Sequence, residues 1–297
     1  MSETTASLRR KINSARELQS VVRTMKALAA SNIGQYEQSV RALADYYRVV
    51  ELGLGVCFRQ RRRVQSIRDG KSDGEAIAAV VFGSDQGLVG RFNDVVAEHA
   101  LQALAALPGK PRVWAVGERV HARLADAGLP LAGVFVVPQS VRAIAPLVGR
   151  ILLDSEAGGG AGELGQLHLF HNRPMPGAVY APVGQRLLPL DDAWRLSLVG
   201  LPWPTNYLPE VVGGGDATLR AHIREYVFVS LFRACAESLA SENASRRAAM
   251  ERADRNIDEL LEHLQGSFHR LRQSSIDEEL FDVISGFEAL SKGAGRQ

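Results

Sequence analysis

The chain has 297 residues, of which 46% are apolar, and this is enough for one or two domains with hydrophobic cores of their own. Its formal net charge of only +2 argues against a strongly basic surface, so no nucleic-acid partner is expected. Two distant cysteines, Cys57 and Cys235, form neither a disulfide framework nor a CxxC motif, which favours a reducing compartment, and we expect neither a signal peptide nor a membrane-spanning segment.

The first predicted element is a long helix. Residues 8–54 contain no proline, and their apolar positions are mostly spaced alternately by three and four. This spacing predicts a heptad-type seam for a partner helix. The seam positions are Leu8, Ile12, Ala15, Leu18, Val22, Met25, Ala29, Tyr36, Val40, Leu43, Tyr47, Val50 and Leu54.

The composition changes after this helix, at Phe58. A basic run follows, made of Arg59, Arg61, Arg62 and Arg63, and then a polar stretch over residues 66–75. One interpretation is a solvated linker. The other is an electrostatic contact with an acidic surface or with lipid headgroups.

From residue 76 to residue 210 the sequence predicts an inserted α/β domain. We expect strands at 76–82, 112–116, 133–137 and 165–170, and helices at 92–107, 118–127 and 140–155. This alternation predicts a parallel, Rossmann-like sheet covered on both faces. Beyond His171 the frequent prolines indicate antiparallel pieces that end the sheet.

Neither catalysis nor metal binding is indicated by the motifs of this domain. The loop from Gly83 to Gly90 follows a strand but lacks the GxGxxG spacing and the lysine of a phosphate loop, so a tight turn is the preferred interpretation. His168 and His171 are three apart on a strand and should face opposite sides. We therefore expect no catalytic residue, no metal site and no cofactor.

The last predicted element is a single helix over residues 216–285, which contain no proline and only one glycine, Gly266. At 1.5 Å per residue, such a helix spans roughly 105 Å and cannot lie inside one compact domain. Its seam is poorer than that of the first helix. It comprises Phe228, Leu231, Cys235, Ser238, Ala249, Ile257, Leu260, Leu264 and Leu271.

The two terminal helices are predicted to pair. Residues 1–57 hold 8 Lys/Arg against 5 Asp/Glu, whereas residues 217–290 hold 9 against 13, so a net +3 helix would meet a net −4 helix. The expected fold is α/β plus coiled coil, with both termini (1–57 and 216–290) forming an antiparallel two-helix coiled coil around the inserted domain (76–210). The alternative is two unrelated surface helices.

The longer last helix should extend beyond its partner, over about residues 268–290. There Leu280, Phe281, Ile284, Phe287 and Leu290 recur at helical spacing and form an apolar stripe. Another protein should enclose this tip, because an apolar stripe exposed to water is unfavourable. The alternative is a tip that folds back on its own domain.

Three stretches resemble the gamma subunit of F-type ATP synthases. They are residues 8–12 leading to Thr24-Met25-Lys26-Ala27-Leu28-Ala29-Ala30-Ser31, the loop Ser84-Asp85-Gln86-Gly87-Leu88-Val89-Gly90-Arg91-Phe92-Asn93, and residues 237–250 continuing to 272–280. Departures from the family pattern stand at Arg23, Asn32, Arg91, Phe92 and Asp277, and they indicate a divergent bacterial branch, with the alternate sodium-associated synthases as one option. The cysteine-bearing insertion of chloroplast members is missing, so thiol switching is not expected.

The resemblance implies a non-catalytic rotor shaft at the cytoplasmic face of the bacterial plasma membrane. Its partners would be the alpha and beta subunits, the epsilon subunit and the c-ring, with membrane contact only through the complex. Small and charged residues over 238–255 would limit adhesion to the surrounding subunits. The expected partner-binding residues are Arg23, Met25, Arg272, Gln273, Leu280, Phe281, Ile284 and Phe287, and the expected contacts at the foot of the shaft are Arg59, Arg61, Arg62, Arg63, Tyr207 and Glu210. The other classes considered are a coiled-coil scaffold with a structural α/β insert and a nucleotide-binding α/β enzyme.

Overall fold

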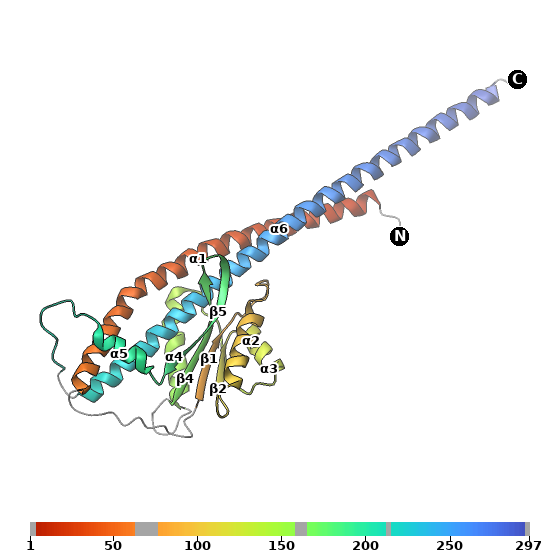
Figure 1. Ribbon diagram of the computed structural model, residues 1–297. Helices are drawn as coiled ribbons and strands as arrows, with labels where there is room; N and C mark the ends of the chain where they lie inside the picture. The colour runs from red at the N-terminus through yellow and green to blue at the C-terminus, as the bar shows by residue number, and fades with distance from the viewer. Residues whose placement is uncertain (1–3, 63–76, 158–164, 212–214, 295–297) are drawn as a thin grey trace. The chain divides into compact units, whose positions relative to one another are not determined.

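The computed structural model describes residues 4–62, 77–157, 165–211 and 215–294, except for the side chains at 61–62, 156–157 and 286–294 (Figure 1). Both ends of the chain are helical: α1 spans Thr5–Arg62 and α6 spans Gly215–Ala294. The chain divides into two compact units. One holds Met1–Leu28 with Arg247–Gln297, and the other holds Ala29–Arg246.

The larger unit is built on a five-stranded mixed sheet with the order β3-β2-β1-β4-β5. The strands are β1 (Ile77–Phe82), β2 (Arg112–Val116), β3 (Leu131–Phe135), β4 (Gln166–Met175) and β5 (Ala178–Leu188). The pairs among β3, β2, β1 and β4 are parallel, as predicted, and β5 is antiparallel to β4. The prediction ended β4 at residue 170, which is five residues too early. The strand continues because it pairs with β5 in a hairpin that turns at Gly177, where φ is +80°.

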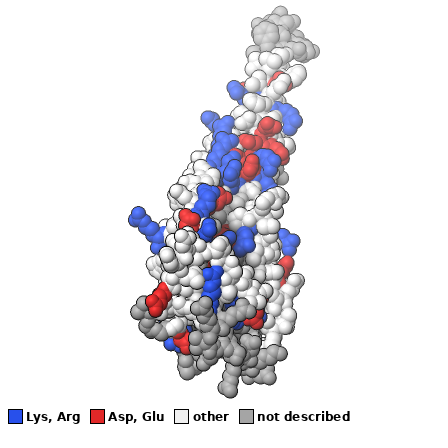
Figure 2. Space-filling view, turned by 60° about the vertical axis from the view of Figure 1, so that its left-hand side comes forward, with Lys and Arg blue, Asp and Glu red and all other residues white. Residues whose placement is uncertain are grey.

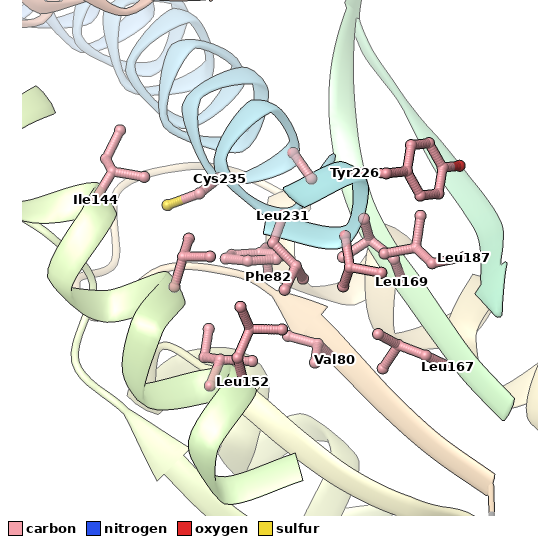
Figure 3. Packing of buried hydrophobic residues seen from close by; sticks show 14 of the residues in the cluster. Val80, Phe82, Ile144, Leu152, Leu167, Leu169, Leu187, Tyr226, Leu231 and Cys235 are labelled. Carbon is pink, nitrogen blue, oxygen red and sulfur yellow. The ribbon is translucent and has the colours of Figure 1, made fainter. Parts of the chain in front are cut away.

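Helices cover both faces of the sheet, and β1 shows why. All six of its residues are buried. Because side chains alternate along a strand, Ala79 and Val81 enter the apolar cluster beneath α2 (Phe92–Ala105) and α3 (Glu118–Asp126), whereas Val80 and Phe82 enter the cluster on the other face. Figure 3 shows this second cluster, in which Phe82 lies near residues of α4 (Ile144–Ala157) and α6. The continuous apolar run of β1 is therefore explained, because side chains on both faces of the strand are buried.

Helix α1 continues past Leu54, where its predicted seam ended, to Arg62. Cys57 and Phe58 remain buried in the core of the larger unit. Arg59 donates from Nε to the carbonyl of Val199 at 2.7 Å and from Nη2 to the carbonyl of Leu201, at the end of the short helix α5 (Asp192–Gly200). The solvated-linker interpretation is therefore wrong for the first part of the basic run, because Arg59 through Arg62 are helical.

In the smaller unit, α1 and α6 pack along an apolar seam with opposite chain directions. Leu8, Ile12, Ala15 and Val22 of α1 form one cluster with Met250, Ile257, Leu261 and Leu264 of α6. Two predicted seam positions are wrong by one residue: Leu18 and Leu260 are 55% and 48% exposed, and the buried neighbours are Gln19 and Leu261. A strict alternation of three and four from Ile12 places Gln19 in the seam. At this point the position in the heptad, and not the polarity of the side chain, determines which residue is buried.

The turn after β2 passes close to the loop after β1, and Gly117 lies at the point of contact. Gly117 has φ +116°, and a Cβ atom there would lie 2.8 Å from backbone atoms of Ser84. We expect Gly117→Ala to destabilise the larger unit by about 2–4 kcal/mol, because backbone strain and a backbone clash add together. Urea denaturation followed through the fluorescence of Trp114, on β2, measures the change.

Gly128→Ala is the matched control. Gly128 also has positive φ, at +79°, but no atom lies within 4 Å of the added Cβ. It should cost only about 1 kcal/mol, the conformational part alone. Equal losses in the two variants would contradict the close approach of Gly117 to Ser84.

Candidate functional site on helix α6 and its contacts

A twelve-residue part of α6, residues 234–245, lies almost fully buried in the larger unit. It is rich in small residues such as Ala234, Ala236, Ala240 and Ser241, each exposed by 2% or less, and these let the helix backbone approach the sheet closely. Residues 238–255 were expected to limit adhesion to the surrounding subunits, and this expectation is wrong for residues 238–245. Those residues are covered by the chain itself.

The charged group at the centre of this segment is Glu237, and three donors hold it. Its carboxylate accepts from His171 Nε2 at 2.8 Å and from Arg173 Nε at 2.7 Å, both on β4, and from Arg233 Nε at 2.8 Å, one turn earlier on α6. Burial alone would raise the pKa of Glu237, but the hydrogen bonds from His171, Arg173 and Arg233 outweigh it and lower the pKa to about 2. Burial lowers the pKa of His171, which is therefore neutral near pH 7 and donates from Nε2.

The glycine-containing loop after β1 is held by bonds within the chain. Ser84 and Asn93 bond reciprocally, backbone N–H to Oδ1 at 2.9 Å and Nδ2 to Oγ at 2.8 Å. Asp85 accepts from the backbone N–H groups of Glu118 and Val137, which ties the loop to the ends of two parallel strands. The loop connects β1 to α2 as the turn interpretation requires, but it takes residues 83–91 to do so and is longer than a tight turn.

The same loop contacts the buried part of α6. Ser245 donates from Oγ to the carbonyl of Val89 at 2.5 Å, and Ser241 donates to the carbonyl of Asn172 at 3.1 Å. Asn172 in turn donates to the carbonyl of Phe92 at 2.9 Å. Two of the sequence stretches that resemble the gamma subunit, residues 84–93 and 237–250, therefore meet in space. The sequence does not reveal this, because about 150 residues separate them.

In the smaller unit, Asp254 of α6 is the acceptor for three side chains of α1. Gln19 Nε2 lies 3.3 Å away, Arg23 Nε 3.0 Å and Lys26 Nζ 2.9 Å. Hydrogen bonds from Lys26 and then from Arg23 lower the pKa of Asp254. The sequence predicted an attraction between a positive first helix and a negative last helix. In the smaller unit, the opposite charges meet at Asp254 and its partners on α1. Arg23, an expected partner-binding residue, is held by the chain itself although its side chain remains 56% exposed, and Met25 packs partly buried against the apolar seam.

The tip of α6 carries most of the other expected partner-binding residues, and they are exposed. Leu280, Phe281 and Ile284 are 56%, 69% and 47% exposed, and Arg272 and Gln273 are exposed as well. The predicted start of the free segment near Phe268 is too early, because Phe268 and Leu271 pack partly buried against the seam. The side chain of Phe287 lies outside the described part.

The structure describes only some of the side chains that were expected at the foot. Tyr207 is 86% exposed and Glu210 is exposed, whereas Arg59 is spent on the carbonyls described above. The side chains of Arg61 and Arg62, and all of Arg63, lie outside the described residues. Whether this group contacts a partner stays a prediction. Figure 2 shows that Lys, Arg, Asp and Glu are interspersed on the face it displays.

Sequence reasoning missed the residues that bind the two helices and the sheet together, namely Gln19, Asp254, Glu237, His171 and Arg173. A signal existed for Gln19, which stands at a seam position of the heptad. His171 and Arg173 are two apart on one strand and therefore share a face. Nothing local in the sequence indicates that Glu237 is their partner.

Acidification should weaken the larger unit through Glu237. Its folded pKa of about 2 lies below the ordinary 4.5, so the carboxylate stabilises the fold above pH 4.5, and this contribution is lost as the pH falls toward 2. We expect Glu237→Gln to lower the free energy of unfolding by about 3 kcal/mol at pH 7, and by much less at pH near 3. Urea denaturation at both pH values measures the difference. The control is Glu251→Gln, an exposed carboxyl of α6, and a pH-independent loss in Glu237→Gln would contradict the ionised cluster.

Removing the charge of Asp254 should loosen the smaller unit. Asp254→Asn removes the counter-charge of Lys26 and one of the two carboxylates beside Arg23, whose Nη2 also lies 3.6 Å from Asp258 Oδ1. Amide hydrogen exchange should therefore speed up over residues 5–28, and less so at high salt, where charge interactions are screened. Glu262→Gln, an exposed position on the same helix, serves as the control. If exchange in Asp254→Asn matched that of the control at low salt, the cluster would have no role in holding the helices together.

The comparisons with known proteins agree with these observations. A family model described as ATP synthase matches residues 4–290. The ATP synthase gamma chain of Parafrankia sp. (strain EAN1pec) is 27% identical, with 96% of this chain and 97% of the relative covered, and that of Clavibacter sepedonicus is 28% identical, with 95% and 96% covered.

Solved structures share the fold. A chain of the Euglena gracilis mitochondrial ATP synthase, in the structure of OSCP/F1/c-ring in rotational state 3, has a TM-score of 0.60 at 15% identity, with 97% of this chain and 95% of that chain covered. A chain of the central stalk and c-ring structure from Tetrahymena thermophila has a TM-score of 0.56 at 21% identity, with 78% and 99% covered. Among the described residues, no helix is both long and apolar enough to cross a bilayer. Because the family model matches nearly the whole chain and the relatives are gamma chains along their full length, the chain belongs to the ATP synthase gamma-chain family.

Proposed function

We propose that this chain is the central rotor shaft of an F-type ATP synthase, coupling ion flow through the membrane sector to ATP synthesis or hydrolysis at the beta subunits. The observation that carries the proposal is the tip of α6. This helix has 80 residues against 58 in α1, and its last described side chains expose an apolar surface that a water-soluble tip would not carry. Family membership supports the same conclusion and disfavours a simple scaffold.

The finer architecture follows from this function. The two terminal helices would act as an antiparallel coiled coil over residues 1–57 and 216–290, and the sheet and its helices as a Rossmann-like insert over 76–210. A heptad seam with opposite chain directions supports the first assignment, and four parallel strands with helices on both faces support the second. A long, continuous helix is stiff enough to transmit torque.

The partners would be the alpha and beta subunits around the tip, and the epsilon subunit and c-ring at the foot. In this arrangement the chain is a peripheral, non-catalytic subunit at the cytoplasmic face of the bacterial plasma membrane. Nucleotides would be held by the alpha and beta subunits. Support comes from the loop between Gly83 and Gly90, which is bound within the chain and lacks a phosphate-loop lysine.

The test is to shorten the tip. Deleting Leu280 to Gln297 removes Leu280, Phe281 and Ile284, whose side chains are exposed. We therefore expect a subunit that folds with unchanged thermal stability but assembles less stably with alpha and beta subunits. Size-exclusion chromatography of the reconstituted complex measures assembly. Unfolding of the shortened subunit on its own would show that the tip belongs to its core and would sink the proposal.

A second variant separates assembly from coupling. Arg272→Ala with Gln273→Ala should leave assembly intact and lower coupled ATP synthesis by about tenfold, the effect of losing one charge-assisted hydrogen bond of ~1.5 kcal/mol to the surrounding subunits. The matched control is Glu251→Ala with Arg252→Ala, two exposed neighbours earlier on the helix. Equal turnover in the two double variants would remove Arg272 and Gln273 from the coupling contact.

A further inference from the structure

A cavity of about 340 Å³ lies in the larger unit, between the β4–β5 hairpin and α6. Its position follows from strand register. His171 and Arg173 share one face of β4, Val183 lies opposite His171 on β5, and Gln185 is two residues further along the same face of that strand. Arg233 lines the other side, from α6. The size falls within the range of small-molecule sites.

The lining is polar and carries an excess of positive charge. Arg173 and Arg233 are cationic, Glu237 is anionic, and His171 is neutral because burial lowers its pKa. Each guanidinium donates to Glu237 from its Nε atom, so its terminal nitrogens make no hydrogen bond to that carboxylate. The side chains of Arg173 and Arg233 are 36% and 44% exposed, so a ligand from solution can reach them.

Glu237 orients the two arginines as well as neutralising one of them. Its side chain is 6% exposed, and both guanidiniums bind it through the same kind of contact at 2.7 and 2.8 Å. Two guanidinium planes fixed on one buried carboxylate form a rigid set of donors, and such donors match the oxygens of phosphate and carboxylate groups. Little side-chain entropy is then lost when an anion binds.

One buried acceptor of the lining lacks a donor. His171 donates from Nε2 to Glu237, so its Nδ1 atom carries a lone pair, and Nδ1 has no hydrogen-bond partner among the described residues. This atom is shielded from solvent, so it is not counted among the contacts of a ligand in the cavity. Tyr47, whose pKa burial raises, remains protonated, and its hydroxyl is engaged in a side-chain hydrogen bond with Tyr226.

We propose that this cavity binds a small oxyanion of the phosphate class, such as hydrogen phosphate or a compact phosphate monoester. Arg173 and Arg233 would contact its negative oxygens through their terminal nitrogens. The bound anion would join β4 of the sheet to α6. This site is separate from the subunit contacts of the proposed rotor function and does not depend on them.

Titration calorimetry of the purified full-length chain with inorganic phosphate tests the proposal. We expect one site per chain, detectable at phosphate concentrations up to about 20 mM, where a millimolar site would also raise thermal stability. Arg173→Gln should weaken binding by about tenfold or more, whereas Arg186→Gln, an exposed arginine of β5 outside the lining, should not. No binding by the unaltered chain, or equal binding by these two variants, overturns the proposal.

Two further arms keep the test decisive if Arg173→Gln folds poorly. Val183→Tyr fills the cavity without touching the bonds of Glu237, and it should abolish binding while the chain stays folded by circular dichroism. Retained binding in this variant places the anion elsewhere and also overturns the proposal. Glycerol 3-phosphate compared with vesicles of phosphatidic acid separates a free monoester, which fits the cavity, from a lipid headgroup.

Discussion

The close approach of α6 to the sheet is the constraint on which the larger unit depends. The backbone of a helix can approach a sheet closely where the side chains between them are small. Residues 234–245 include several alanines and serines, which allow this close approach. The polar atoms that become buried in this way need partners, since an unpaired charge in the interior costs several kcal/mol. His171, Arg173 and Arg233 satisfy Glu237, and the carbonyls of Val89 and Asn172 satisfy two of the serines. The loop after β1 and the second half of β4 provide these hydrogen-bond partners.

Helix α6 passes through three environments, and this explains why its apolar pattern is hard to read. Residues 234–245 are buried on nearly every side, residues 250–264 present only one apolar stripe to α1, and residues 276–284 are exposed. Each environment selects a different face and a different mixture of residues, so no single period holds along the whole helix. Absence of proline is the property common to all three parts. The sequence therefore predicts the helix as a continuous element far better than it predicts which side of the helix is covered.

The sequence was sufficient for the order of elements from α1 to β4, because strand and helix periods differ and the pattern changes at each boundary, but helix α5 was not predicted. β2 has the predicted bounds, and β1 matches the prediction over 77–82, while residue 76 lies outside the described part of the chain. Errors arose where tertiary contacts overrode residue type. Leu18 seemed the better seam residue than Gln19, but Asp254 and Asp258 offer Gln19 acceptors on the facing helix. Likewise Arg59 seemed to begin a linker, and only the carbonyls of a helix about 140 residues away make it a structural residue.

Polar groups within the seam between α1 and α6 determine the register in which the two helices pair. An apolar seam alone permits slippage by a heptad, since each step of seven residues places apolar side chains opposite one another again. Such a step would move one helix along the other by about 10 Å and would separate Asp254 from Gln19 and Lys26, leaving these polar groups against apolar neighbours. Because α1 begins at Thr5, the register also determines how much of α6 continues past its partner. The contacts of Asp254 therefore set the length of the exposed apolar tip, which is the part of the helix on which the proposed function depends.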